Sequence, residues 1–251
     1  MSSALIGHTG FVGQNLRAAA QFDVVVNSSN VEELRGRSFD LVVCAGARAE
    51  KWKANRDPAA DLAGIERLLG VLHEVRARRF LLVSTVDVFE RPIGVDESAD
   101  ADAHHPYGRH RRLLEALSAH AFDTLIVRLP ALFGPGLKKN ALYDLLHDNQ
   151  VDRIHPESTY QFYDVRWLWS DAERAREAGI HLLHLATEPL SMGEIAERCF
   201  GRVLRVPSAN PARYDVRSRH AEAWGGKHGY LRMRDDVLTA LQSFVREERG
   251  A

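Results

Sequence analysis

Short apolar runs alternate with amphipathic stretches along the whole chain. The apolar runs predict strands at residues 4–6, 22–26, 39–44, 80–84, 124–128, 160–165 and 182–186. Between them, the spacing of apolar residues predicts helices over residues 14–21, 57–78, 170–179 and 191–200, and from residues 107 and 233 onward. Near-continuous apolar runs such as residues 39–44 are typical of buried parallel strands. The alternation predicts an α/β fold with a Rossmann-like, doubly wound parallel sheet.

Composition narrows the class of protein without changing that fold. The 251 residues are 45% hydrophobic with a formal net charge of −1, so we expect a sizeable core and no nucleic-acid partner. No apolar run is long enough to span a bilayer, and no targeting segment is evident, so no membrane partner is expected. Cys44 and Cys199 lie far apart in the sequence, which fits a reducing compartment better than a disulfide framework. We expect a cytoplasmic protein with a small-molecule substrate, and a homodimer is a candidate assembly.

Three glycines, Gly7, Gly10 and Gly13, mark the first predicted strand-to-helix turn. Glycine permits a tight turn and a close approach of the backbone to a pyrophosphate, and the helix N-terminus that follows favours an anion. A simple glycine-rich turn is the alternative, but the position at the first turn of an alternating chain favours a nucleotide site. The predicted cofactor-binding residues of this turn are Gly7, Thr9, Gly10, Phe11, Val12 and Gly13.

The run Gly7-His8-Thr9-Gly10-Phe11-Val12-Gly13 resembles the short-chain dehydrogenase/reductase superfamily, and more closely its extended, sugar-nucleotide epimerase/dehydratase branch. A second matching segment, residues 128–136, reads Arg-Leu-Pro-Ala-Leu-Phe-Gly-Pro-Gly. The resemblance implies an NAD(P)-binding Rossmann domain over residues 1–136 and a small, reduced C-terminal substrate lobe over residues 137–251. Residues 160–187 would return strands to the Rossmann sheet. Further implied cofactor contacts are Ala45, Gly46, Ala47, Ser84 and Pro130.

The end of the second predicted strand bears on the choice between NAD and NADP. In NAD-binding folds an acidic residue near this point commonly binds the ribose hydroxyls. Here the chain reads Asn27-Ser28-Ser29-Asn30, and the next acid is Glu32. An uncharged tip tolerates a 2′-phosphate, so the sequence favours NADP; a polar turn that does not discriminate is the alternative, because Arg35 and Arg37 are no more than candidates for a phosphate partner. The predicted cofactor contacts at this tip are Asn27, Ser28 and Ser29.

The resemblance implies a reaction centre at Tyr107. The family has a Tyr and, four residues later on the same helix face, a Lys whose ammonium lowers the pKa of the Tyr and holds the nicotinamide ribose. This chain has Arg111 at the Lys position, which keeps the charge but cannot relay a proton. Thr85 matches the family's catalytic hydroxyl at a strand end. The predicted catalytic residues are therefore Tyr107, Thr85 and Arg111.

Two interpretations of this centre remain open. In the first, the protein is an NAD(P)-dependent oxidoreductase or epimerase that acts on a carbonyl or secondary alcohol of a sugar or sugar nucleotide, with Tyr107 as general acid or base. In the second, it is a catalytically silent NAD(P)-binding regulatory or partner-binding protein. Ser84 and Thr85 in isolation are typical of local backbone hydrogen bonding, but their match beside Tyr107 favours the enzyme. Reduction and epimerisation share this machinery, and the sequence does not separate them.

Candidate substrate contacts lie on both sides of the predicted centre. They are Asp87, Lys138, Lys139 and Asn140. Dehydratases of the branch carry an acidic pair just after the catalytic hydroxyl, where this chain has Asp87 alone. The two lysines follow the segment 128–136, where relatives contact a nucleotide sugar; a solvated basic turn is the alternative. The adjacent His104 and His105 have no nearby ligands at metal-binding spacing, so no metal site is predicted.

Overall fold

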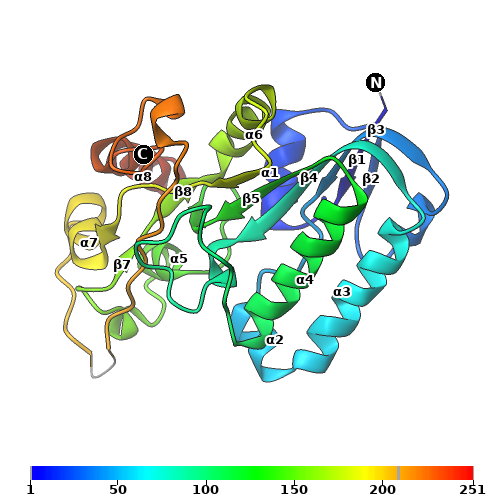
Figure 1. Cartoon of the computed structure of the whole chain (residues 1–251). Helices are drawn as coiled ribbons and strands as arrows, with labels where there is room; N and C mark the ends of the chain where they lie inside the picture. Colours follow the sequence, from blue (N-terminus) through cyan, green and yellow to red (C-terminus); the bar gives the residue numbers. More distant parts are fainter. Residues whose placement is uncertain (1, 208–209, 251) are drawn as a thin grey trace. The chain divides into compact units, whose positions relative to one another are not determined.

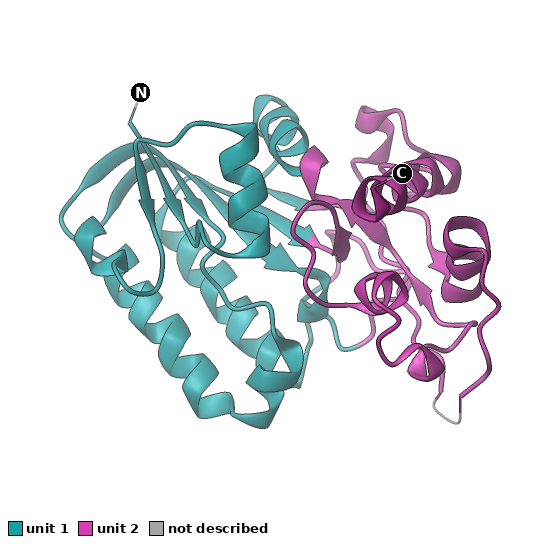
Figure 2. Cartoon of the chain, turned by 180° about the vertical axis from the view of Figure 1, so that it is seen from behind, with its two compact units in different colours: residues 1–90, 100–128, 168–183 teal, residues 91–99, 129–167, 184–251 magenta. Residues whose placement is uncertain are grey.

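A computed structural model describes residues 2–207 and 210–250. The chain divides into two compact units, which Figure 2 shows in different colours. Unit 1 takes residues 1–90, 100–128 and 168–183, and unit 2 takes residues 91–99, 129–167 and 184–251. The two units therefore do not divide at residue 136, where the sequence suggested a boundary: residues 91–99 and 129–136 belong to unit 2, and residues 168–183 belong to unit 1.

Unit 1 is built on a six-stranded sheet in the order β2-β1-β3-β4-β5-β9. The pairs β1–β2, β1–β3 and β3–β4 are parallel, with Ala4 opposite both Val24 and Val42. The elements in chain order are β1 (Ser3–Ile6), α1 (Phe11–Ala19), β2 (Val24–Val26), η1 (Val31–Leu34), β3 (Ser38–Cys44), α2 (Lys51–Arg56), α3 (Pro58–Leu72), β4 (Arg76–Thr85), η2 (Val86–Val88), α4 (Pro106–Ala121), β5 (Thr124–Leu129), α6 (Leu168–Glu177) and β9 (Leu182–His184).

Helices cover both faces of this sheet. On one face, α3 and α4 lie side by side (Figure 1), and α3 buries Ile65, Leu68 and Val71 in one core cluster with Val42 and Phe80 of the strands. Side chains of neighbouring strand residues point to opposite faces. Accordingly Leu41, Leu81 and Leu125 line the other face together with Ala172 of α6. The predicted α/β, doubly wound, Rossmann-like architecture is confirmed.

Parallel strands bring their carboxyl ends to one edge of the sheet, where open α/β sheets bind ligands. The glycine turn follows β1, Asn27 follows β2, Ala45 follows β3, and Thr85 ends β4. The topology therefore collects at one edge the predicted site residues that the sequence spreads over about a hundred positions.

Unit 2 has its own hydrophobic core, formed by short strands and helices. Its elements are β6 (Ala131–Phe133), α5 (Ala141–Leu146), η3 (Val151–Arg153), β7 (Thr159–Tyr160), β8 (Phe162–Asp164), η4 (Val165–Trp167), β10 (Leu190–Ser191), α7 (Met192–Phe200), η5 (Ala221–Trp224) and α8 (Arg234–Arg249). The core gathers Phe133, Phe162, Ile195, Leu241 and Phe244. Ser191 caps α7 by accepting from the N–H of Glu194 at 3.2 Å, as the sequence predicted.

The predicted strand at residues 160–165 is wrong as a single element. Gln161 is buried, and its side chain donates to the carbonyls of Thr187 and Val216. The chain changes partners at this residue: β7 pairs antiparallel with β10, and β8 pairs parallel with β6. Within residues 160–187, the six-stranded sheet takes β9 alone among the described strands.

The predicted helix over residues 57–78 also needs correction. Helix α3 ends at Leu72, and β4 begins at Arg76. The N–H of Arg76 donates to the carbonyl of Arg37 at 2.9 Å. Residues from Arg76 onward therefore pair with the neighbouring strand, which a helical pattern in the sequence cannot show.

Gly64 offers a direct test of helix α3. It lies in the helix interior and is exposed, and a Cβ at this position would meet no atom within 4 Å. Gly64→Ala should therefore raise the free energy of unfolding by roughly 0.5–1 kcal/mol, because alanine has the higher helix propensity. Urea denaturation measures this; a loss of stability would contradict the open position described.

Candidate active site

The turn between β1 and α1 packs tightly against the turn that follows β3. Gly7 has φ +90°, and a Cβ there would lie 2.4 Å from the carbonyl oxygen of Ala45. A Cβ on Gly13 would lie 2.1 Å from the carbonyl oxygen of Gly7. Gly46 is similarly close to Ile6, at 2.8 Å from Cγ2. The chain's own packing thus requires glycine at positions 7 and 13.

Gly10 is different. Its φ of −76° suits any residue, and a Cβ there would meet only the Gly7 carbonyl, at an ordinary 3.4 Å. Gly10 is the N-cap of α1 and makes no side-chain hydrogen bond to the first helical amides. Thr9 and Gly10 are exposed, and Phe11 and Val12 are half-buried. Open space before an uncapped helix N-terminus fits the pyrophosphate of a dinucleotide.

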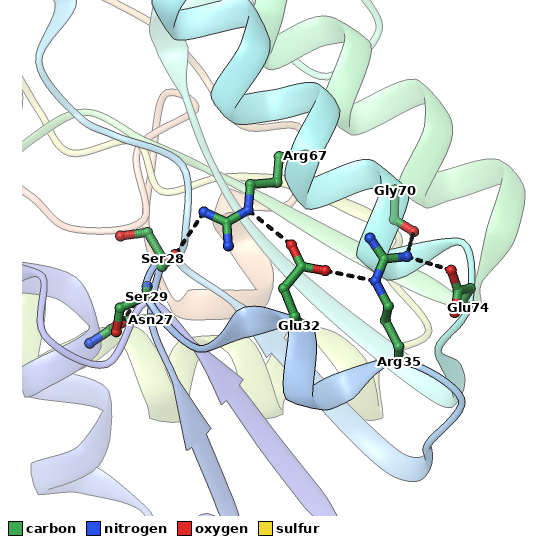
Figure 3. A network of polar contacts seen from close by, with 8 residues as sticks. All are labelled: Asn27, Ser28, Ser29, Glu32, Arg35, Arg67, Gly70 and Glu74. Carbon is green, nitrogen blue, oxygen red and sulfur yellow. Dashed lines mark hydrogen bonds and ion pairs between the residues drawn. The ribbon is translucent and has the colours of Figure 1, made fainter.

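The tip after β2 is held in place by hydrogen bonds between its own residues and by hydrogen bonds from Arg67 of α3 (Figure 3). Oδ1 of Asn27 accepts from the backbone N–H and the hydroxyl of Ser29, at 2.8 and 2.6 Å. Arg67 donates to the carbonyl of Ser28 at 3.0 Å and to Glu32 at 2.9 Å. Arg67 is therefore a cation in direct contact with this tip, and sequence reasoning missed it because it is about forty positions away along the chain.

Glu32, the first acid after the tip, is already paired. It accepts from Arg67 and, at 2.6 Å, from Arg35, whose other contacts are Glu74 and the carbonyl of Gly70 (Figure 3). The hydrogen bonds from Arg67 and then Arg35 hold the pKa of Glu32 below its ordinary value. Arg35, one of the two candidates from the sequence, thus faces Glu32 and Glu74.

Tyr107 is buried in the first turn of α4, with 6% of its surface exposed. Its N–H donates to Oδ1 of Asn55 in α2 at 3.0 Å, and the Thr85 hydroxyl lowers the pKa of its phenol. Burial raises the pKa of the phenol; the charge of Arg111 opposes this, and the carboxylate of Asp87 adds to it. Tyr107 is therefore protonated at neutral pH and can act as a proton donor to an atom held beside Thr85.

Arg111 contacts Tyr107, but its charge is balanced from α3. The guanidinium carbon lies 4.3 Å from the centroid of the Tyr107 ring. Asp61 accepts from Arg111 at 2.7 and 3.1 Å and from His110 at 2.7 Å, and the Arg48 carbonyl also accepts from Arg111. Burial alone would raise the pKa of Asp61, but these hydrogen bonds outweigh it and lower that pKa. The role predicted for Arg111 on a ribose stays a prediction.

Ser84 serves a buried network between β4 and α4. Its hydroxyl donates to Glu115 at 2.5 Å, and Glu115 forms a two-point pair with Arg128 at 3.0 and 2.7 Å. All three side chains are buried. These bonds give Ser84 a structural role, and its predicted contact with the cofactor stays a prediction.

Asp87 lies just beyond Thr85 and is paired with a residue that the sequence did not single out. Lys51 Nζ is 2.7 Å from Oδ1 of Asp87. The ring of His105 stacks on that of Tyr107, with centroids 6.5 Å apart. Nδ1 of His105 accepts from the N–H of Gly108 as the cap of α4, which leaves the proton of the neutral ring on Nε2. Among the described residues, that buried Nε2 has no hydrogen-bond partner.

The remaining predicted residues belong to unit 2. Pro130 is buried between β5 and β6. Lys138 and Lys139 are exposed. Asn140 caps α5 by accepting from the N–H groups of Leu142 and Tyr143 at 3.0 and 3.1 Å, and its amide donates to Leu132 at 2.8 Å. Its side chain is thus engaged in a structural role.

Two further observations concern metal binding, membrane-spanning helices and the position of a cavity. Within residues 2–207 and 210–250, no group of three His, Cys, Asp or Glu side chains could hold a metal ion, and no helix is long and apolar enough to cross a membrane. A cavity of about 280 Å³ in unit 1 lies between α6 and the sheet, near Arg79 of β4 and Asp123 before β5. It is toward the amino ends of these strands, whereas Thr85 lies at a carboxyl end, so the cavity is separate from Tyr107.

Comparisons with known proteins agree with this geometry. The NAD-dependent epimerase/dehydratase family matches residues 19–177. No curated protein gives a significant match. Similar solved structures include UDP-glucose 4-epimerase with UDP-glucose from Thermotoga maritima (15% identity, TM-score 0.73, 100% of this chain and 99% of that chain), a dTDP-4-dehydrorhamnose reductase from Clostridium acetobutylicum (15%, 0.75, 99% and 100%) and RMD from Pseudomonas aeruginosa complexed with NADPH (19%, 0.74, 98% and 99%). At these identities the structural likeness shows the fold.

The contrast between Gly10 and Gly13 yields a test of the glycine turn. Gly10→Ala should weaken binding of a nicotinamide dinucleotide about tenfold or more, ~1.4 kcal/mol, because the new methyl group occupies space left open by the chain. Its thermal unfolding midpoint should stay near that of the wild type. Fluorescence titration with NADPH and NADH, alongside thermal unfolding, measures both.

Gly13→Ala is the matched control, since its methyl group would overlap the Gly7 carbonyl and should lower the thermal midpoint. Wild-type dinucleotide affinity in Gly10→Ala would show that no pyrophosphate lies against this turn.

Proposed function

This chain belongs to the NAD-dependent epimerase/dehydratase family and is an NAD(P)-dependent enzyme of that family, and on that premise we propose that it is an NADP-dependent reductase of a carbonyl group on a sugar or sugar nucleotide. The observation that carries the proposal is the buried, protonated Tyr107, with Arg111 over its ring and with a pKa that the hydroxyl of Thr85, at the carboxyl end of β4, lowers. A bound nicotinamide dinucleotide supplies hydride chemistry in such a site.

The chain's own residues supply the acid. Thr85 donates a hydrogen bond to the substrate carbonyl oxygen and fixes its position, and Tyr107 transfers its proton to that oxygen as the carbonyl is reduced. Burial of Tyr107 excludes water from the transfer. Arg111, over the ring, opposes the effect of burial and keeps the phenol acidic enough to react.

The sugar-nucleotide class is supported by the structural neighbours, two of which are named for UDP-glucose and dTDP-4-dehydrorhamnose. We assign Lys138 and Lys139, which are exposed in unit 2, to the phosphates of such a substrate. Pro130 is assigned to the nicotinamide end of the cofactor. Unit 2 then acts as the substrate lobe.

The preference for NADP is supported by the tip after β2. Asn27, Ser28 and Ser29 carry no charge, and Arg67 is held there by the Ser28 carbonyl and Glu32 (Figure 3). An Arg near this point accommodates a 2′-phosphate, whereas an unpaired acid favours the ribose hydroxyls of NAD.

A silent, cofactor-binding protein is the second candidate, and one observation favours it. Asp61 balances the charge of Arg111, the cation that lies over the Tyr107 ring. Loss of turnover with retained cofactor binding in a single Tyr107 variant separates the two candidates.

Tyr107→Phe should reduce NADPH-dependent reduction of dTDP-4-dehydrorhamnose by about 10²–10⁴-fold, the usual contribution of a general acid. Its dissociation constant for NADPH should stay near the wild-type value, because the phenol is assigned to the substrate oxygen. Loss of NADPH absorbance follows the reaction, and fluorescence titration follows binding.

Tyr143→Phe, in unit 2, is the matched control and should behave as wild type. Equal turnover of Tyr107→Phe and wild type would leave the silent protein as the better description. Formation of a reduced nucleotide on mixing UDP-glucose with the NAD-loaded protein would instead favour the epimerase.

Arg67→Gln should weaken NADPH binding about tenfold, ~1.4 kcal/mol, and leave NADH binding nearly unchanged, because only the former carries a 2′-phosphate. Arg35→Gln removes a guanidinium from the same network at its far end (Figure 3) and should leave the ratio of the two affinities unchanged. A wild-type ratio in Arg67→Gln would contradict the NADP assignment.

A further inference from the structure

Arg111, the cation over the ring of Tyr107, is already paired with Asp61. A second charged residue can therefore also influence the Tyr107 hydroxyl. The guanidinium of Arg111 lies over the Tyr107 ring, but Asp61 binds it through both carboxylate oxygens. Asp61 and Arg111 side chains are 7% and 3% exposed, so the pair is nearly free of solvent screening. Arg111 therefore acts on Tyr107 as one half of an ion pair, and its charge still lowers the pKa of the phenol.

Lys51 reaches the same site from α2. Its Nζ lies 2.7 Å from Oδ1 of Asp87. Four positions later, Asn55 accepts the backbone N–H of Tyr107 at 3.0 Å. Residues four apart share a helix face. One face of α2 therefore binds both the Asp87 side chain and the first turn of α4.

Asp87 is itself fixed against the surroundings of Tyr107. Its N–H donates to Oγ1 of Thr85 at 3.1 Å, and the Thr85 hydroxyl and the Asp87 carboxylate both act on the pKa of Tyr107. The Asp87 carbonyl approaches α4 so closely that a Cβ on Gly108 would lie 2.4 Å from it. Contacts from α2, η2 and α4 thus hold an ammonium, a carboxylate, a hydroxyl and a phenol in one cluster.

Given the role proposed above for Tyr107, we infer that Lys51 and Asp87 are positioning residues that control proton transfer at its hydroxyl. Lys51 holds the Asp87 carboxylate and balances its charge, so that the phenol faces an ion pair and not a lone anion. When the phenol proton moves to the substrate oxygen, the carboxylate charge of Asp87 that acts on the phenolate is balanced by the Lys51 ammonium. That ammonium can exchange protons with solvent, which the guanidinium of Arg111 cannot do.

The other groups that face Tyr107 are consistent with this assignment. Burial raises the pKa of Tyr107, the charge of Arg111 lowers it, and Asp87 raises it further. Burial and then the Lys51 ammonium lower the pKa of His105, so the stacked ring is neutral near pH 7. Asp61 and His110 act on Tyr107 through Arg111. A substitution can shift the balance of the Lys51–Asp87 pair in either direction.

The test follows ionisation of Tyr107 in the cofactor-free protein by ultraviolet difference titration, with Tyr107→Phe as the blank. Lys51→Gln should raise the midpoint by about one pH unit, a tenfold gain in proton affinity, because Asp87 loses its counterion. Asp87→Asn should lower the midpoint by a similar amount. Lys51→Arg keeps the charge and should restore a midpoint near that of the wild type.

Lys53→Gln is the matched control. Lys53 lies on the same helix but pairs with Glu50 at 2.6 Å and is 53% exposed, so its loss should leave the midpoint unchanged. The opposite signs expected for Lys51→Gln and Asp87→Asn keep the test decisive if either variant folds poorly, which circular dichroism reports. Unchanged midpoints in both, or the same shift in Lys53→Gln, overturn the inference.

The titration uses no cofactor or substrate, so it is independent of the proposed reaction. A protein that shows these shifts but no NADPH-dependent turnover would overturn the proposed function and retain the charge control of Tyr107. A protein that turns over with unshifted midpoints would retain the function and remove Lys51 and Asp87 from its control.

Discussion

The close approach of α4 to the end of β4 is the constraint on which the rest of the site depends. Gly108 permits it, because any larger residue would overlap the carbonyl of Asp87. His105 caps the helix at this point, and Asn55 binds the N–H of Tyr107. With the helix start fixed in this way, the Thr85 hydroxyl acts on the pKa of Tyr107, although the two residues are distant in sequence.

Charges buried along this helix are matched one by one. Arg111 is paired with Asp61, and Arg128 is paired with Glu115, with every one of these side chains 7% exposed or less. Removing one partner of such a pair leaves an uncompensated buried charge, at a cost of about 3–5 kcal/mol. These pairs therefore fix the helix against α3 and β5, and they keep the electrostatic surroundings of Tyr107 from depending on solvent. The pair of Lys51 and Asp87 is more exposed, so it is better suited to adjustment than to anchoring.

The glycine turn separates two demands that look alike in sequence. Gly7 and Gly13 are glycines because the turns after β1 and β3 touch, whereas Gly10 has space around it. A spacing pattern alone assigns all three to the nucleotide. In the fold, packing requires glycine at positions 7 and 13 and does not require it at position 10. The polar tip after β2 shows the reverse case, since its charge partner, Arg67, comes from α3 and carries no local signal in the sequence.

The sequence by itself determined the alternating α/β order and the glycine turn, because each depends on local periodicity or on residues a few positions apart. The resemblance to the family is what singled out Thr85 and Tyr107. It also identified Asp87, without its partner. The tertiary structure decided which charges meet: Lys51 with Asp87, Asp61 with Arg111, Arg67 with the Ser28 carbonyl. It also decided that the chain changes strand partners at Gln161 and that Asn140 caps a helix. Such contacts join residues that are distant in sequence, and long side chains on different elements can meet only after the backbone has placed those elements together.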